Sequence, residues 1–339
     1  MKGDLPGALN AAIRSLKEKL AAEPKDIASR TACEFALESI IPAVPEMIGG
    51  SADLTGSNNT RTKAMKTMTA ADYSGRFIHY GIREHGMGSV MNGMALHGGV
   101  IPYGATFLVF TDYMRPPMRL AALMGVHVIY VFTHDSIGLG EDGPTHQPVE
   151  HLTALRCVPN MTVIRPADAG ETVEAWRVAL KRKKGPVALV LTRQKLAFID
   201  RSKYAPADGV AKGAYTLVDA KDGKPEVVLM ASGSEVAAIM EAQAKLEAQG
   251  IRTRAVSMPS HNLFAEQPQG YRDEILPPGT KRVSLEAAHP MSWLRWVGSD
   301  GIALGIERYG ASAPYERIYE ELGLMADDVV QAALKLVRR

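Results

Sequence analysis

Short runs of apolar residues recur along the first part of the chain and predict the strands of a buried sheet. The strongest, residues 126–132, is nearly continuous in apolar residues, as expected of a strand that is buried on both faces. Residues 161–164 and 187–191 repeat this pattern, and a helical period over residues 170–181 lies between them. Strand, helix and strand with short connections form the βαβ unit of a parallel sheet. The pattern therefore predicts an α/β domain.

Further elements are predicted ahead of this unit. Residues 5–20 alternate charged and apolar positions, as an amphipathic surface helix does. Residues 27–40 are predicted to form a helix that stops before Pro42, because proline removes a backbone donor. A short strand over residues 77–80 leads into a helical run over residues 84–96 that is rich in Gly and Met.

A second set of elements follows a break in the pattern. Polar and small residues prevail over residues 195–212, which predicts a linker. Beyond it we expect strands at residues 226–231, 253–258, 281–286 and 301–305, and helices at residues 234–249 and 327–337. The fold class is therefore α/β with two domains, each a mainly parallel sheet flanked by helices. We expect a terminal helix or linker over residues 1–25, a first domain over residues 26–205, and a smaller second domain over residues 206–339.

Composition narrows the class of protein. The chain has 339 residues, of which 46% are hydrophobic and 22% charged, as in ordinary globular proteins. Its net charge of +2 is scattered, whereas a nucleic-acid-binding protein should show a basic stripe. Two cysteines, Cys33 and Cys157, cannot form a disulfide scaffold. No apolar stretch is long enough for a membrane span, and no apolar signal core opens the chain. We therefore expect a cytoplasmic protein that binds neither nucleic acid nor membrane.

The stretch richest in polar groups, residues 133–148, follows the strongest predicted strand, where open parallel sheets bind ligands. Its glycines allow tight turns, and His134, Asp142 and His146 supply polar groups. A tight surface turn explains any one of these residues, but not the whole run.

The same stretch also matches a dinucleotide-binding pattern. Gly138, Gly140 and Gly143 satisfy G-x-G-x-x-G. However, the acidic pair after Gly140 would lie beside a pyrophosphate, and Pro144 removes a backbone N–H that should bind it. A nicotinamide-dependent dehydrogenase is therefore disfavoured.

Glu84 opens the helical run that follows the strand at residues 77–80. A glutamate at a helix start commonly interacts with the helix dipole. Because Glu84 lies between a strand and an apolar helix, we expect it to be partly buried. A desolvated carboxylate holds its proton more tightly and can exchange it near neutral pH.

Three aromatic residues, Phe107, Phe110 and Tyr113, recur at intervals of three. An aromatic helix face that fills the core is one interpretation, and a slot for a flat heterocycle is the other. Separately, Arg30, Ser57 and Arg193 lie near predicted element ends; with His134 they would form a phosphate clamp, because guanidinium groups match phosphate oxygens.

These stretches together resemble transketolase, the thiamine-diphosphate enzyme that moves a two-carbon ketol unit between sugar phosphates. The landmarks occur in order at residues 50–54, 79–87, 106–113, 133–148, 191–194, 231–235 and 256–260. The run at residues 140–148 separates transketolase and the related dihydroxyacetone synthase from deoxyxylulose-phosphate synthases.

The resemblance implies a role for each candidate residue. It makes Glu84 the partner of N1′ of the aminopyrimidine, where its proton favours the imino form that deprotonates thiazolium C2, and it makes His146 a proton-transfer and C1-hydroxyl partner. The aromatic pocket around the pyrimidine would be Phe107, Phe110 and Tyr113. The substrate-phosphate clamp would be Arg30, Ser57, His134 and Arg193, and Asp142 would bind a substrate hydroxyl.

The resemblance also indicates a missing part. Transketolases bind the cofactor's diphosphate and magnesium through an earlier domain with Gly-Asp-Gly followed by Asn, and no Gly-Asp-Gly occurs here. We expect a thiamine-diphosphate-fold pyrimidine domain plus a C-terminal domain, with no metal ligands of its own. The chain would form a homodimer, act on sugar phosphates in the pentose phosphate pathway, and need a separate diphosphate-binding half for activity. The alternative is a catalytically silent dimerising module or fragment.

Overall fold

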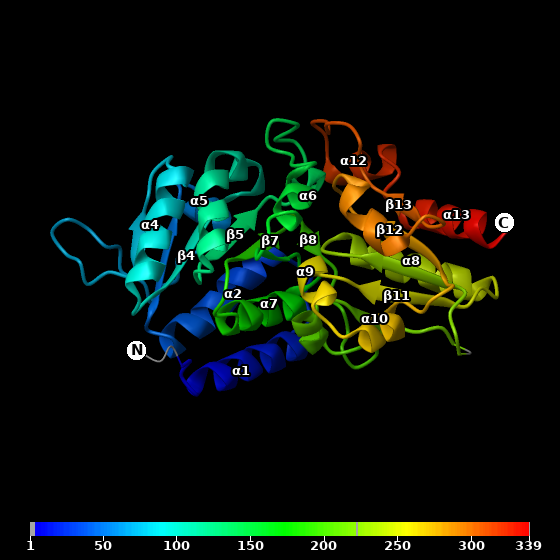
Figure 1. Ribbon diagram of the computed structural model, residues 1–339, viewed down its shortest axis with the longest axis horizontal. Coiled ribbons are helices and arrows are strands. Elements are labelled where there is room, and N and C mark those ends of the chain that lie inside the picture. Colours follow the sequence, from blue (N-terminus) through cyan, green and yellow to red (C-terminus); the bar gives the residue numbers. More distant parts are fainter. Residues whose placement is uncertain (1–3, 222, 339) are drawn as a thin grey trace.

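The computed structural model describes residues 4–221 and 223–338. It contains two larger sheets that lie along the long axis of the molecule (Figure 1). The first sheet has six parallel strands in the order β3-β2-β4-β5-β7-β6. These strands are β2 (Met47–Ser51), β3 (Phe77–His79), β4 (Ile101–Phe107), β5 (Ile129–Thr133), β6 (Thr162–Ile164) and β7 (Val187–Leu191).

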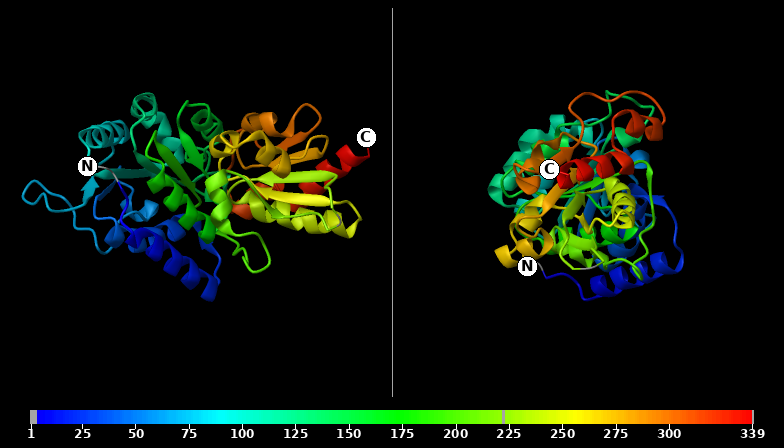
Figure 2. Two further views of the ribbon diagram at one scale, coloured as in Figure 1. Left: turned by 60° about the horizontal axis from the view of Figure 1, so that its bottom comes forward. Right: turned by 90° about the vertical axis from the view of Figure 1, so that its right-hand side faces the viewer.

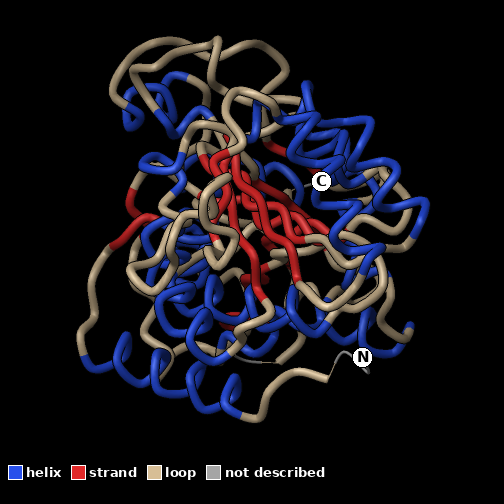
Figure 3. Tube along the Cα trace, turned by 90° about the vertical axis from the view of Figure 1, so that its left-hand side faces the viewer, coloured by secondary structure: helices blue, strands red, loops and turns tan. Residues whose placement is uncertain are grey.

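Helices cover both faces of this sheet (Figure 3). The side chains of β5 point alternately to the two faces and pack against these helices on each side. Ile129 and Val131 pack on one side, against helices α1 (Ala8–Ala22), α2 (Ser29–Ala43) and α7 (Ala169–Lys181). Tyr130 and Phe132 pack on the other side, against α4 (Glu84–His97), α5 (Thr111–Met124) and α6 (His151–Arg156). Both faces of β5 are therefore buried, as its apolar run predicts.

The second sheet, formed by the yellow-green to orange part of the chain in Figure 2, has the order β13-β12-β10-β11-β9. Only β9 is antiparallel to its neighbour. Its strands are β9 (Tyr215–Val218), β10 (Val227–Ala231), β11 (Thr253–Ser257), β12 (Lys281–Leu285) and β13 (Ile302–Leu304). The helices of this part are α8 (Glu235–Ala248), α9 (His261–Ala265), α10 (Gln269–Ile275), α11 (Leu294–Val297), α12 (Tyr315–Glu321) and α13 (Ala326–Val337). Two mainly parallel sheets flanked by helices confirm the predicted fold class.

Some predicted elements differ from the structure. Helix α2 continues through Pro42 to Ala43, because a proline in the last turn costs only one intrahelical hydrogen bond. The segment predicted as a linker includes a short strand, β8 (Lys195–Leu196), which pairs antiparallel with β1 (Ile27–Ala28), and a 3₁₀ helix, η3 (Ala207–Lys212).

The largest difference lies around the aromatic run, where no single helix forms. Strand β4 ends at Phe107, and a 3₁₀ helix, η1 (Leu108–Phe110), leads into α5. Pro102 and Gly104 interrupt the apolar pattern of β4, which is why the sequence does not reveal this central strand. Gly104 is needed there, because a Cβ at this position would lie 2.4 Å from Sδ of Met91. Within the described chain, every helix is too short or too polar to cross a bilayer.

Candidate functional site

The candidate residues gather at the carboxyl edge of the first sheet. Ser51, Phe107, Thr133 and Leu191 end neighbouring or nearby strands of this sheet, and the segments after them carry the candidate side chains. Ligands of open parallel sheets bind at this edge. Strands β2 and β4, which the sequence did not reveal, therefore place Ser57 and the aromatic residues beside the loop that follows β5.

Glu84 is the first residue of α4, and only 6% of it is exposed. The hydroxyl of Thr106, which is fully buried on β4, donates to Oε1 of Glu84 at 3.2 Å. The predicted burial of this carboxylate is confirmed. The fixed donor on Oε1 holds this nearly buried carboxylate in one orientation.

Five rings form a cluster at the end of β4, the strand that carries Thr106. They belong to Phe107, Phe110, Tyr113, His134 and His146. The two phenylalanine rings lie nearly parallel with centroids 5.7 Å apart, and His134 stacks on Phe107 at 3.7 Å. The cluster opens towards solvent: Phe107 is buried, Phe110 is half-buried and Tyr113 is 65% exposed. This gradient contradicts a purely core-filling aromatic face and leaves ring surface free to contact a flat ligand.

His134 follows β5 directly and adopts a left-handed backbone conformation with φ 59°. Its Nδ1 lies 2.9 Å from the hydroxyl of Thr133. Burial, followed by the positive charges of Arg30 and Arg193, lowers the pKa of His134 to about 3. The imidazole is therefore neutral near pH 7 and acts there as a hydrogen-bonding group.

A buried hydroxyl pair holds the two arginines near each other. The backbone N–H of Ser29 donates to Oγ1 of Thr192 at 3.0 Å, and the backbone N–H of Thr192 donates to Oγ of Ser29 at 2.7 Å. The next residue along each segment is Arg30 or Arg193. This reciprocal pairing joins the start of α2 to the end of β7.

Each arginine donates one hydrogen bond to a backbone carbonyl. Nη1 of Arg30 donates to the carbonyl of Ser57 at 2.9 Å, and Nη1 of Arg193 donates to the carbonyl of Leu139 at 3.1 Å. Burial and the nearby Arg193 lower the pKa of Arg30, while Asp142 acts in the opposite direction. Nε of Arg30 is buried without a hydrogen-bond partner in the described chain. An anion near these groups would relieve both the repulsion and the unpaired donor.

The structure thus brings the candidate residues together in two groups. The first group contains Glu84 and Thr106. The second contains the aromatic cluster together with Arg30 and Arg193. The two groups meet on β4, where Thr106 and Phe107 are consecutive residues. Asp142 is exposed on the loop after β5, and His146 is half-buried, with Nδ1 3.0 Å from the hydroxyl of Thr145. Ser57 contributes its carbonyl to the Arg30 contact, so the structure does not show its hydroxyl in the clamp.

Several buried polar residues at this edge were not singled out from the sequence. They are Ser51, Asn58, Thr106 and Thr133, each with no exposed surface. A polar residue at the end of an apolar strand run is the signal that could have identified Thr106 and Thr133. Asn58 has no such signal, because its importance depends on contacts with strands distant in sequence.

One group of possible metal ligands occurs in the part of the chain that the structure describes. Its members are Asp112, Glu150 and His151, whose ligand atoms lie within 4.8 Å of one another. Oδ1 of Asp112 is 3.3 Å from Nε2 of the buried His151. This contact joins the start of α5 to the start of α6, next to the aromatic cluster.

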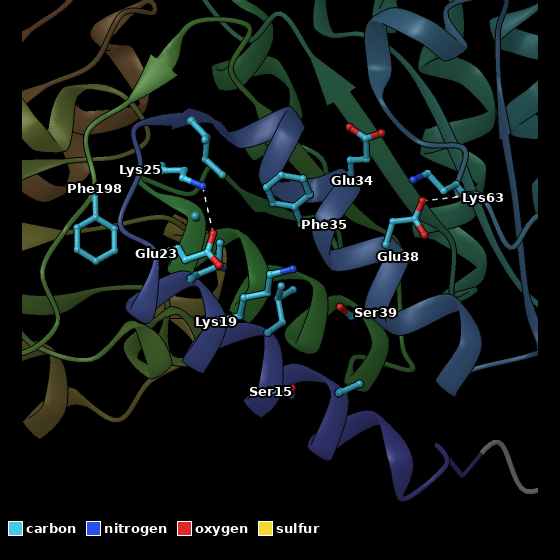
Figure 4. Close-up of a pocket in the computed structure, with 15 residues that line it drawn as sticks. Ser15, Lys19, Glu23, Lys25, Glu34, Phe35, Glu38, Ser39, Lys63 and Phe198 are labelled. Carbon is cyan, nitrogen blue, oxygen red and sulfur yellow. Dashed lines mark hydrogen bonds and ion pairs between the residues drawn. The ribbon is translucent and has the colours of Figure 1, made fainter.

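A cavity of about 740 Å³ lies elsewhere, between α1 and α2 (Figure 4). Leu16, Leu20 and Phe35 supply apolar surface, and charged residues, including the ion pair of Lys25 with Glu23 at 3.1 Å, surround it. None of the candidate site residues lines this cavity. The chemistry of the strand edge, and not the size of this cavity, identifies the candidate site.

Comparisons with known proteins show the family of this chain. Residues 25–198 match the family described as transketolase, pyrimidine binding domain, and residues 213–325 match the transketolase-like C-terminal domain. The chain belongs to the transketolase family. The resemblance stated from the sequence is therefore confirmed.

Curated transketolases from Aquifex aeolicus and Geobacillus stearothermophilus are each 50% identical, over 94% and 92% of this chain but only 46% and 47% of their own length. The chain spans about half the length of the curated relatives it matches. Among solved structures, transketolase from Leishmania mexicana matches all of this chain and 48% of its own, with a TM-score of 0.91 and 41% identity.

Another solved structure has nearly the same extent as this chain. It is described as a split gene transketolase, an inactive β4 tetramer, and the match covers 92% of this chain and 99% of that one. Its TM-score is 0.73 and its identity 26%.

Proposed function

We propose that this chain supplies the pyrimidine-binding and C-terminal half of a transketolase. The assembled enzyme would transfer a two-carbon ketol unit from a ketose phosphate to an aldose phosphate. The division into a pyrimidine domain at residues 26–205 and a C-terminal domain at residues 206–339 is part of this proposal. The proposal also includes the pentose phosphate pathway, which rests on the family resemblance, and a cytoplasmic location, which rests on the pattern of the sequence.

The observation that carries the proposal is the buried Glu84 next to an aromatic cluster that opens to solvent. These residues fit the pyrimidine end of thiamine diphosphate, which needs a proton-exchanging carboxylate and a flat apolar surface. When bound, thiamine diphosphate supplies the nucleophilic carbon that carries the ketol unit. In this reading Glu84 holds and exchanges a proton at its carboxylate with the aminopyrimidine ring. Phe107, Phe110 and Tyr113 pack on that ring and exclude water from it.

The remaining candidate residues would bind the sugar phosphate. Arg30 and Arg193 supply the positive charge for the phosphate, and the neutral His134 supplies a hydrogen bond. Asp142 and His146 lie on the loop after β5 and would contact substrate hydroxyls, with His146 also transferring a proton. Ser57 would complete the clamp through its position beside Arg30.

The diphosphate and its magnesium ion would be bound by a separate half. Magnesium prefers carboxylate and carbonyl oxygens together with phosphate oxygens. The sequence lacks the family's Gly-Asp-Gly. The candidate site presents mainly arginines and aromatic rings, which are not ligands for magnesium. The solved split-gene transketolase of nearly the same extent supports the existence of such two-part enzymes. We therefore propose that this chain alone is inactive.

A second copy of this chain would cover an apolar surface on α4 and α5, which lie side by side in Figure 1. On this surface Val90 and Leu96 belong to α4, and Leu120 and Leu123 belong to α5; all four are exposed. Exposed apolar side chains gathered on neighbouring helices favour burial in an interface. We therefore propose a homodimer through this surface.

The test is reconstitution. The chain is mixed with, or fused to, a transketolase diphosphate-binding half, for example that of the Aquifex aeolicus relative, together with thiamine diphosphate and magnesium. We expect two-carbon transfer in the mixture and none from either half alone. The Glu84→Gln chain in the same mixture is the matched control. A stable complex that binds cofactor but transfers nothing would favour the alternative, a silent dimerising module.

A further inference from the structure

A continuous line of buried hydrogen bonds leads from the end of β2 to His134. The backbone N–H of Leu54 donates to Oγ of Ser51 at 3.1 Å, and that hydroxyl donates to Oδ1 of Asn58 at 2.9 Å. Nδ2 of Asn58 lies 2.7 Å from Oγ1 of Thr133, which in turn lies 2.9 Å from Nδ1 of His134. Ser51, Asn58 and Thr133 have no exposed surface, so water does not compete for these bonds.

A backbone carbonyl determines the orientation of the Asn58 amide. Nδ2 of Asn58 also donates to the carbonyl oxygen of Thr106 at 3.2 Å. A carbonyl can only accept, so the amide group that faces it must be the NH₂. The reversed amide would place two acceptors against each other and would leave a buried carbonyl without its donor. The second hydrogen of the NH₂ therefore points to Thr133.

The direction of the remaining bond follows from the hydroxyl of Thr133. This oxygen accepts from Asn58, and its own hydrogen needs an acceptor. In the described chain its other hydrogen-bond partner is Nδ1 of His134. If Nδ1 carried a hydrogen, the buried Thr133 hydroxyl would have no acceptor, and a buried donor without an acceptor is destabilising. Nδ1 must therefore accept, and in a neutral ring the hydrogen is then on Nε2.

We propose that Asn58 is a positioning residue that sets the tautomer of His134, so that Nε2–H is the donor presented to a phosphate group of the substrate. Phosphate oxygens only accept hydrogen bonds, and an unprotonated Nε2 would repel them. The charge of the clamp comes from Arg30 and Arg193, and the neutral imidazole adds direction without a third cation. The left-handed backbone of His134 and its stacking on Phe107 hold the ring in place.

The inference rests on the proposed phosphate role of His134, but its test does not need an active enzyme. Long-range ¹H–¹⁵N spectra of the histidine-labelled full chain distinguish Nδ1–H from Nε2–H, and His134→Gln identifies the signal. We expect Nε2–H in the wild-type chain at neutral pH. An Nδ1–H ring would overturn the inference and leave the transketolase proposal intact.

Two pairs of variants test the hydrogen-bond line itself. Thr133→Val removes the hydroxyl at constant shape, so the Nδ1 resonance of His134 should move towards that of a free acceptor. Thr133→Ser keeps the hydroxyl and should leave this resonance unchanged.

The second pair changes residue 58. Asn58→Asp makes this residue an acceptor, so the Thr133 hydroxyl turns towards it and Nδ1–H should appear on His134. Asn58→Leu, at similar volume, should give both tautomers. An unmoved Nδ1 resonance in Thr133→Val, or pure Nε2–H in a folded Asn58→Asp chain, would overturn the proposal. If neither Asn58 variant folds, the Thr133 pair alone decides.

Kinetics of the reconstituted enzyme separate positioning from general stability. Thr133→Val should raise KM for a phosphorylated ketose substrate about tenfold, with little change in kcat. This factor is at the lower end of the range for a hydrogen bond to a charged group. KM for a non-phosphorylated donor should be unchanged. Equal effects on both donors would show a general structural role and would overturn the proposal.

Discussion

The Arg165 guanidinium donates from Nε to Oδ2 of Asp135 at 2.8 Å, and neither side chain is exposed. Asp135 directly follows His134, while Nη1 of Arg165 donates to the carbonyl of Ser232 at 2.8 Å and pairs with Glu235. Ser232 directly follows β10 of the second sheet, and Glu235 is the first residue of helix α8. The residue next to the candidate phosphate ligand is therefore held to the C-terminal domain by a buried charge network.

Replacing Arg165 should destabilise the protein strongly. Arg165→Met leaves Asp135 and Glu235 buried without their cation, which typically costs about 3–5 kcal/mol in the free energy of unfolding. Urea denaturation of the two chains measures this difference. The control is Arg317→Met, whose exposed pair with Glu320 at 3.0 Å should contribute less than about 1 kcal/mol. Equal, small losses in both variants would contradict a structural role for the buried network.

His134 should make the protein sensitive to acid. Its pKa is lowered from 6.5 to about 3 in the folded chain, so between these values the unfolded chain binds the proton and the folded chain does not. The free energy of unfolding should therefore fall as pH decreases from about 6.5 towards 3, by up to about 1.4 kcal/mol per pH unit for this group. His134→Gln should flatten that slope between pH 6 and pH 4.5. The exposed His97, changed to Gln, is the control, and an identical slope in the His134 variant would contradict this assignment.

The sequence was sufficient for the parts of the fold that depend on local pattern. Residues 187–191, predicted as a strand, form β7 over the same residues, and residues 84–96 form α4 with one further residue. Strand β4 was missed because Pro102 and Gly104 break its apolar run. Its glycine is required by close packing against Met91, a contact distant in sequence.

The contacts of the candidate site likewise depend on residues that are distant in sequence. Individual residues such as Glu84 and His134 could be selected from their residue type and from the family resemblance. The contact of Glu84 with Thr106 and the line through Asn58 join segments tens of residues apart, so no local pattern contains them. Burial of these hydroxyls and amides, which gives each hydrogen bond its direction, exists only in the folded chain.

Arg30 should affect the binding of phosphorylated substrates in the reconstituted enzyme. Arg30→Gln removes a charged donor, so KM for a phosphorylated donor should rise roughly 10–100-fold while kcat changes little. A non-phosphorylated donor should be nearly unaffected. The exposed Arg14 of α1, changed to Gln, is the matched control for loss of positive charge. Similar losses with both donors would contradict the phosphate role.

The exposed apolar surface on α4 and α5 should mediate self-association. Leu123→Glu places a charge on a side chain that is 69% exposed, so it should leave the fold intact but prevent burial in an interface. Sedimentation at micromolar concentration should show dimers for the wild-type chain and monomers for the variant. Leu294→Glu, on the exposed surface of α11, is the control and should remain dimeric. A Leu123→Glu chain that stays dimeric would place the interface elsewhere.

Glu84 should control turnover more than substrate affinity. Glu84→Gln preserves the shape of the side chain, and its amide can still accept from Thr106, but it cannot exchange a proton with the aminopyrimidine. General acid–base catalysis is typically worth ~10²–10⁴-fold, or roughly 3–5 kcal/mol of barrier, so kcat should fall by that factor while KM stays within a few-fold. Steady-state kinetics of the reconstituted enzyme test this, with Thr106→Val as a second variant that keeps the carboxylate but removes its donor. Because the carboxylate remains, that variant should lose much less activity than Glu84→Gln. Near-normal turnover in Glu84→Gln would remove Glu84 from the proposed proton transfer, even if the chain still completes an active transketolase.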